Sequence, residues 1–239
     1  MKKFFTLIAA AMMVAGANAQ GTYAVQEGDS ISAGLKIESV PGVTMTFSET
    51  GGTFIAGKKV ANWVDADFVA YSNGSANGKF SAGTAPTGCY YKFETSKDGV
   101  LTVGIQLSPN KGFFVADKDF ASVELSSYNL PDSKDATESQ TLTTNEKGEP
   151  IIPASGIKSN GTVTFNVAAN GTYYVLATGT KLGFFGFKFT TTSTGINDIN
   201  VAPVANENAP VYNLAGQRVS KEAKGILIQN GKKFINNNK

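Results

Sequence analysis

Alternation of apolar and polar side chains along short segments is the feature that most constrains the fold of this chain. A period of two places successive side chains on opposite faces of a strand, so each such segment has one apolar and one polar face. In segment 100–107, Leu101, Val103 and Ile105 alternate with mostly polar residues. Four other segments share the pattern: 43–48, 89–95, 162–167 and 183–189. The sequence therefore predicts an all-β chain of half-buried antiparallel strands.

Turn residues between these segments indicate how the strands connect. Asn170-Gly171 follows segment 162–167 and predicts a hairpin with 172–178, and Asp98-Gly99 joins two more of the alternating segments. No segment after residue 20 keeps a helical apolar period for three turns. We therefore expect residues 20–194 to form a two-sheet antiparallel β-sandwich, jelly-roll-like, with a closed barrel as the alternative.

Aromatic residues in the strands are assigned to faces by the same alternation. In segment 183–189 it predicts that Phe184 lies on the face opposite the core. Tyr90 and Tyr174 also fall on the polar faces of their segments. These three side chains form either an exposed aromatic platform or a set packed beneath a loop or the tail. The side chains predicted in the core are Phe185, Phe187 and Phe189.

Composition excludes several kinds of chemistry. The 239 residues include no His and one Cys, so His-dependent catalysis, His-ligated zinc and an intramolecular disulfide are excluded. Cys89 alternates with apolar residues and is predicted to be a buried thiol. Residues 20–194 carry 13 Lys, 16 acidic residues and no Arg, since Arg218 is the only arginine. Arg is favoured for phosphate and base edges, so we expect no nucleic-acid partner.

The N-terminus has the pattern of a secretory signal peptide over residues 1–19. Lys2 and Lys3 precede an apolar run at 4–14 that is shorter than the roughly 20 residues needed to cross a bilayer. Ala17 and Ala19 supply the small residues of a cleavage site. We expect cleavage after Ala19 and a secreted or cell-surface protein with no transmembrane segment.

Two stretches interrupt the strand pattern. Residues 129–160 are rich in Pro and polar residues and form a long insertion, either a mobile surface loop or one that shapes a binding face. Residues 195–210 have the composition of a linker. Beyond it, residues 211–239 contain two strand-turn-strand patterns, the second around Asn230-Gly231, and predict a small β-hairpin unit.

The tail carries two motifs: Val-Tyr-Asn-Leu-Ala-Gly-Gln-Arg-Val at 211–219 and Lys-Gly-Ile-Leu-Ile-Gln-Asn-Gly-Lys-Lys-Phe at 224–234. Together they resemble the C-terminal sorting domain of type IX secretion cargo, over about residues 195–239. The resemblance implies a small Ig-like unit that is recognised by the outer-membrane export machinery of certain Gram-negative bacteria. This tail is shorter than the usual domain and ends in Asn236-Asn237-Asn238-Lys239 rather than in an apolar strand.

The main domain resembles, more loosely, β-sandwich modules that occur beside pectate lyases and other secreted glycan-degrading enzymes. The similar stretches are 88–93, 98–103 and 171–189, especially Thr172-Tyr173-Tyr174-Val175 and Lys181-Leu182-Gly183-Phe184-Phe185-Gly186-Phe187. Because these are strand and turn positions, the resemblance implies a shared fold more than a shared chemistry.

The candidate carbohydrate-binding residues lie in one stretch around the only tryptophan. Trp63 has Asp65, Asp67 and Tyr71 close by in the sequence. Sugar sites offer a flat aromatic face to C–H groups and polar side chains to hydroxyls. The alternative is that Trp63 fills the core, as large aromatic side chains often do.

Acidic residues raise two further hypotheses. Asp65/Asp67 and Asp117/Asp119 are spaced so that each pair shares a face of a strand, and such oxygens suit a structural calcium ion, although a solvated loop explains them as well. No motif marks a catalytic carboxylate pair, and no other cofactor or metal is expected. We therefore expect a non-enzymatic, glycan-binding or accessory module. The alternatives are a structural or adhesive surface protein without a sugar site, and a polysaccharide lyase or hydrolase.

Overall fold

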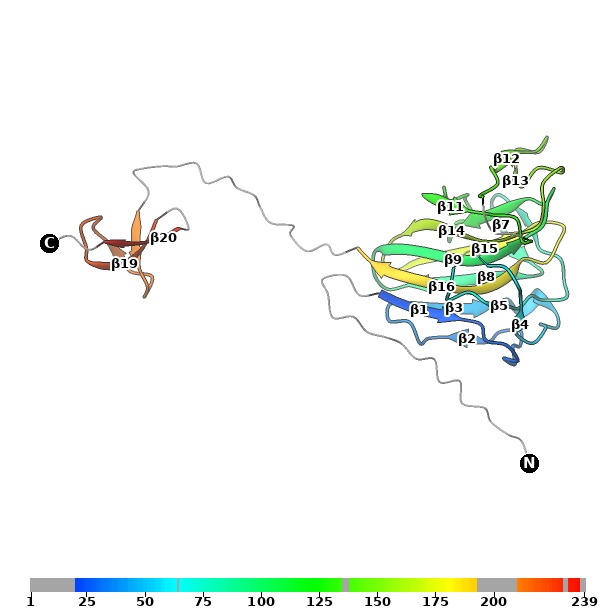
Figure 1. Cartoon of the computed structure of the whole chain (residues 1–239), viewed down its shortest axis with the longest axis horizontal. Coiled ribbons are helices and arrows are strands. Elements are labelled where there is room, and N and C mark those ends of the chain that lie inside the picture. Colours follow the sequence, from blue (N-terminus) through cyan, green and yellow to red (C-terminus); the bar gives the residue numbers. More distant parts are fainter. Residues whose placement is uncertain (1–19, 64, 135–137, 193–209, 230–231, 237–239) are drawn as a thin grey trace, which may run out of the picture. The chain divides into compact units, whose positions relative to one another are not determined.

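The chain divides into two compact units, Met1–Thr194 and Gly195–Lys239. The computed structural model describes residues 20–63, 65–134, 138–192, 210–229 and 232–236 (Figure 1). The predicted leader and almost all of the predicted linker lie outside these residues. The described residues confirm an all-β chain: they form antiparallel strands and one 3₁₀ turn, η1 (Glu49–Gly51), but no α-helix. Within them, no helix has the length and apolar character needed to cross a membrane.

Two five-stranded antiparallel sheets make up most of the first unit. Sheet I has the strand order β1-β16-β9-β14-β11, and sheet II has the order β10-β15-β8-β3-β2. The strands of sheet I are β1 (Gln20–Ala24), β9 (Gly99–Leu107), β11 (Ser127–Asn129), β14 (Ser159–Val167) and β16 (Gly183–Thr191). The strands of sheet II are β2 (Lys36–Ile37), β3 (Val43–Phe47), β8 (Tyr90–Thr95), β10 (Phe113–Ala116) and β15 (Gly171–Ala177).

Three small two-stranded sheets complete this unit, and none of the described sheets is closed. They are β4 (Lys58–Lys59) with β5 (Ala70–Tyr71), β6 (Lys79–Ser81) with β7 (Thr84–Thr87), and β12 (Thr143–Thr144) with β13 (Pro150–Ile151).

One hydrophobic core receives side chains from both large sheets. The ring of Phe184 on β16 stacks on that of Tyr91 on β8 with centroids 4.6 Å apart, and meets Phe47 on β3 edge-on at 5.5 Å. The alternation predicted for the strands is confirmed on β9, where Leu101 and Val103 are fully buried and Thr102 between them is half-buried. Burial of these apolar side chains therefore stabilises the first unit, and both large sheets contribute to it.

Phe184 corrects the predicted faces of β16. It is fully buried in the core cluster. Phe185 is buried as predicted, at 1% exposed, but it packs on Tyr71 at 5.6 Å and does not belong to that cluster. The cause is a β-bulge between Phe184 and Gly186, which shifts the register of β16 against β9. A bulge inserts one residue and breaks the period of two. Gly186 permits it, because its φ of 144° is a backbone conformation that side chains disfavour.

The hairpin predicted at Asn170-Gly171 is wrong. Asn170 has a φ of 58° and a turn does form there, but β14 before it belongs to sheet I and β15 after it belongs to sheet II. The turn at Asp98-Gly99 likewise passes from β8 in sheet II to β9 in sheet I. The local turn signal was correct, and the pairing was not, because pairing is decided by which strand each apolar face meets.

The insertion at 129–160 is anchored in the core at two points. Leu130 and Ile152 are fully buried in the core, and the short strands β12 and β13 pair between them. The core therefore fixes the position of the segment, and with it the position of the residues between β12 and β13.

The second unit contains one four-stranded antiparallel sheet with the order β18-β17-β19-β20. Its strands are β17 (Val211–Asn213), β18 (Arg218–Val219), β19 (Gly225–Gln229) and β20 (Lys232–Asn236). The two predicted hairpins are both present in it, and pairing of β17 with β19 joins them. The turn at Asn230-Gly231 lies outside the described residues.

Candidate functional site

Two of the predicted site residues lie together, on the segment between β4 and β5. Asp65 and Asp67 both approach the ammonium group of Lys188 on β16, at 2.7 and 3.0 Å. Asp65 also accepts a hydrogen bond from the backbone N–H of Asp67 at 3.0 Å, which fixes the turn. The two carboxylates are thus engaged by one cation.

Lys188 is held in place from a second side by Phe68, whose ring centroid lies 5.4 Å from its Nζ. Burial lowers the pKa of Lys188, but hydrogen bonds and charge attraction from Asp65 and Asp67 outweigh it and raise the pKa above its ordinary value of 10.5. Lys188 therefore keeps its charge, and the cluster clamps the β4–β5 segment onto sheet I.

The other two predicted site residues do not join this cluster. Trp63 is half-buried and absent from the core, and in the described chain no hydrogen bond or ring contact links it to Asp65 or Asp67. Tyr71 packs on Phe185, with ring centroids 5.6 Å apart. Trp63 is thus not among the fully buried core side chains, and part of its surface is exposed to solvent.

Neither aspartate pair gathers the ligands of a metal site. The carboxylate of Asp117 accepts backbone N–H groups of Asp119 and Ala121, both at 2.9 Å, so it closes a turn. Within the described ranges, no three His, Cys, Asp or Glu side chains come together as a metal ion would need. Turn formation and the Lys188 clamp account for these carboxylates.

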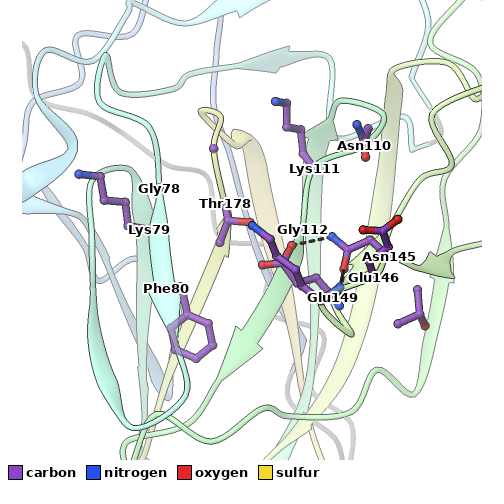
Figure 2. A pocket seen from close by; sticks show the side chains of 13 residues that line it. Gly78, Lys79, Phe80, Asn110, Lys111, Gly112, Asn145, Glu146, Glu149 and Thr178 are labelled. Carbon is purple, nitrogen blue, oxygen red and sulfur yellow. Dashed lines mark hydrogen bonds between the residues drawn. The ribbon is translucent and has the colours of Figure 1, made fainter.

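A pocket of about 760 Å³ opens elsewhere on the first unit, where four segments meet (Figure 2). They are the start of β6, the loop before β10, the end of β15 and the segment between β12 and β13 of the insertion. Its lining residues are Gly78, Lys79, Phe80, Asn110, Lys111, Gly112, Thr144, Asn145, Glu146, Lys147, Glu149, Thr178 and Gly179. The insertion thus forms one wall.

Backbone hydrogen bonds hold the base of the pocket. The N–H of Thr178 donates to Gly112 at 2.8 Å, and the N–H of Gly179 donates to Gly78 at 3.0 Å. Three of the four segments are therefore tied to one another, which gives the lining side chains a rigid support.

Asn145 and Glu149 form the wall from the insertion. The Asn145 amide donates to the Glu149 carboxylate at 2.7 Å, and its oxygen accepts the backbone N–H of Glu149 at 2.9 Å. The carboxylate lies over Gly112, where an added Cβ would be 3.0 Å from it and 2.6 Å from Thr178 Oγ1. Glycine at 112 is therefore needed for this close approach, and Figure 2 shows Glu149 at the centre of the pocket.

Three lysines, Lys79, Lys111 and Lys147, line the same pocket. None of their ammonium groups forms an ion pair or a side-chain hydrogen bond with the part of the chain that the structure describes. Lys111 is half-buried, whereas Lys79 and Lys147 are exposed. The pocket therefore combines unpaired cations with the carboxylates of Glu146 and Glu149.

An aromatic face borders the pocket. Phe80 on β6 packs on Phe114 of β10 with ring centroids 5.0 Å apart. Further along the outer face of sheet II, Tyr174 packs against Tyr90 at 5.7 Å and against Phe120 at 5.6 Å. Tyr90 and Tyr174 are half-buried, so they pack against each other and the loop after β10.

The pocket was not predicted from the sequence because its four segments are far apart along the chain. The only indication in the sequence is the polar composition of 129–160, which is typical of a mobile surface loop or of a loop that shapes a binding face. Nothing local in the stretches 78–80 and 110–112 shows that they meet the insertion.

Comparison with protein families and with curated proteins adds no constraint on this site. No model of a known protein family matches the chain. A search of curated proteins finds no relative.

Proposed function

We propose that residues 20–194 form a two-sheet, jelly-roll-like sandwich that binds glycans without cleaving them. The ring contacts of Phe184 with Tyr91 and Phe47 support the sandwich, because they link strands of sheets I and II. The order of the strands supports the comparison with a jelly roll, since the chain passes repeatedly from one sheet to the other.

The pocket at the insertion is the observation that carries the glycan proposal. Sugar sites combine an aromatic face, which packs on the C–H groups of the sugar, with amide and carboxylate groups, which form hydrogen bonds with its hydroxyls. Phe80 supplies the first, and Asn145 with Glu149 supplies the second. An open, largely polar pocket suits a sugar unit better than it suits an apolar ligand.

Trp63 is the second candidate for the aromatic face. It is half-buried on the segment that the Lys188 clamp holds to sheet I. A partly exposed indole on an anchored segment is a stacking surface.

Glycan-array binding of the mature chain tests the proposal, with three variants. We expect Glu149→Gln and Phe80→Ala to abolish retention on at least one glycan while the melting curve stays cooperative. We expect Trp63→Ala to leave that retention unchanged. Loss of binding in Trp63→Ala alone moves the site to the Trp63 segment.

The array also separates the alternative functions. If the folded protein binds no glycan on the array, a structural or adhesive surface protein is favoured. Release of oligosaccharide products from a polysaccharide panel indicates a lyase or hydrolase and contradicts the non-enzymatic proposal.

We further propose that the tail is a sorting unit and that the protein is secreted to the cell surface after loss of residues 1–19. The second unit exposes apolar side chains on one face of its sheet, since Tyr212, Ile226 and Ile235 are 38%, 43% and 67% exposed. An exposed apolar face on a small separate unit is typical of a surface that meets a partner. Deletion of 211–239 is expected to trap the protein in the periplasm, and unchanged export rejects the proposal.

A further inference from the structure

We propose that the ligand of the pocket is an acidic sugar unit, a hexuronic acid, whose carboxylate pairs with Lys111. This inference rests on the proposed glycan binding and specifies the class of glycan. Two observations support it: the other half-buried lysines form ion pairs whereas Lys111 does not, and both lysines and glutamates line the pocket.

The half-buried lysines elsewhere in the described chain form ion pairs with carboxylates. Among the lysines whose burial the structure describes, three are half-buried: Lys92, Lys111 and Lys188. Lys92 pairs with Glu94 at 3.0 Å, and Lys188 pairs with two aspartates. Lys111 lines the pocket and, alone of the three, has no carboxylate partner in the part of the chain that the structure describes.

An unpaired, partly buried ammonium group favours an anionic ligand. Withdrawal from water weakens the solvation of the charge, and a ligand carboxylate restores a charge-assisted hydrogen bond. Lys79 and Lys147 add two further unpaired cations around the same opening. A neutral sugar leaves all three charges without a partner.

The two glutamates narrow the ligand class further. Glu146 and Glu149 line the pocket with the lysines, so a ligand whose polar groups are all anionic, such as a heavily sulfated sugar, meets repulsion. A hexuronic acid offers hydroxyl groups that donate to Glu149 and accept from the remaining N–H of the Asn145 amide, and it offers one carboxylate for Lys111. Its C–H face suits Phe80, so its mixed chemistry matches the mixed lining.

Calorimetric titration of the mature chain with oligosaccharides tests the inference. The probes are oligogalacturonate and oligoalginate, each beside its carboxyl-reduced neutral counterpart, and a sulfated galactan oligosaccharide. We expect at least one acidic probe to bind at least about tenfold more tightly than its reduced counterpart, because one charge-assisted contact is lost. We expect its affinity to fall as salt rises.

Lys111→Met keeps the length and packing of the side chain and removes its charge. It is expected to weaken binding of the acidic probe about tenfold and to leave binding of the reduced probe unchanged. Lys92→Met, at a half-buried lysine away from the pocket, is the matched control and is expected to change neither. Melting curves of both variants confirm that the fold is retained.

The outcomes distinguish this inference from the proposal on which it rests. Equal binding of acidic and reduced probes, or tighter binding of the sulfated probe, overturns the uronic-acid assignment and leaves glycan binding in place. An acidic preference that survives Lys111→Met overturns the role of Lys111. Absence of binding to every probe, together with a silent glycan array, overturns both proposals.

Discussion

Tyr91 is a fully buried polar side chain at the centre of the first unit. Its hydroxyl donates to the carbonyl of Leu182 at 2.5 Å, and its ring stacks on Phe184. The neighbouring thiol of Cys89 is fully buried as well, as the sequence predicted, and accepts the N–H of Gly74 at 3.3 Å. Burial raises the pKa of Cys89 and raises that of Tyr91 well above its ordinary value of 10.0. Both groups are therefore neutral hydrogen-bonding parts of the core.

This burial predicts a loss of stability at alkaline pH. An unfolded tyrosine ionises near pH 10, whereas folded Tyr91 resists ionisation. Its contribution to the unfolding free energy is thus full below pH 10 and is lost as the pH rises toward the folded pKa. We expect the unfolding free energy, measured in urea, to decrease above pH 10 by up to about 1.4 kcal/mol per pH unit for this group.

Tyr91→Phe separates Tyr91 from other groups that ionise in this range. The variant is expected to lose about 1 kcal/mol at pH 7, because the hydrogen bond to Leu182 is gone, and to show a shallower alkaline decrease. An alkaline slope identical to that of the unaltered protein contradicts the assignment to Tyr91.

At the scale of elements, the sequence predicted strands and their buried faces well wherever a strand is regular. On β9, β8 and β14 the predicted apolar positions are all buried. It failed on β16, because a bulge shifts the period of two and local spacing does not reveal a bulge. It failed at Asn170-Gly171 as well, since a turn sequence does not determine which sheet the next strand joins.

Gly186 is predicted to be indispensable to the bulge of β16. An added Cβ would lie 2.2 Å from the carbonyl oxygen of Tyr23 on β1, and the φ of 144° is strained for any side chain. We expect Gly186→Ala to lower the unfolding free energy by about 3 kcal/mol or more, measured in urea.

Gly83→Ala is the matched control for this variant. Gly83 also has a positive φ, of 76°, but no heavy atom lies within 4 Å of its added Cβ. Its substitution is expected to cost about 1 kcal/mol, from backbone strain alone. Equal costs at the two glycines contradict the clash with Tyr23.

The candidate site shows the same division between local pattern and tertiary contact. The sequence singled out Asp65 and Asp67, which do lie together, but it gave no sign of Lys188, whose side chain comes from a strand more than a hundred residues away. Lys111, Asn145 and Glu149 become a site only where four segments meet. The sequence thus predicts side chains that lie close together along the chain, whereas it does not predict contacts between residues that only the fold brings together.

At the scale of the molecule, the chain consists of a large unit with a shared core and a small one with a single sheet. In the small unit the buried apolar residues are Val211 and Leu227 among those described, which is little for independent stability. The segments that the sequence assigns to the two units also differ in charge: residues 20–194 carry 13 Lys and 16 acidic residues, and 195–239 carry six basic and three acidic residues.

Truncation after Thr194 tests whether the large unit depends on the small one. We expect the chain 20–194 to have the same melting temperature as the chain 20–239 and the same affinity for any glycan that binds, because the shared core and the pocket lie entirely within the first unit. Differential scanning calorimetry at low and high salt provides the measurement. Opposite net charges attract at low ionic strength and are screened at about 0.5 M salt. A melting temperature that falls on truncation only at low salt therefore indicates that the tail docks by charge attraction. A fall at both salt concentrations indicates an apolar contact. Either result contradicts the expectation that the large unit is stable without the small one.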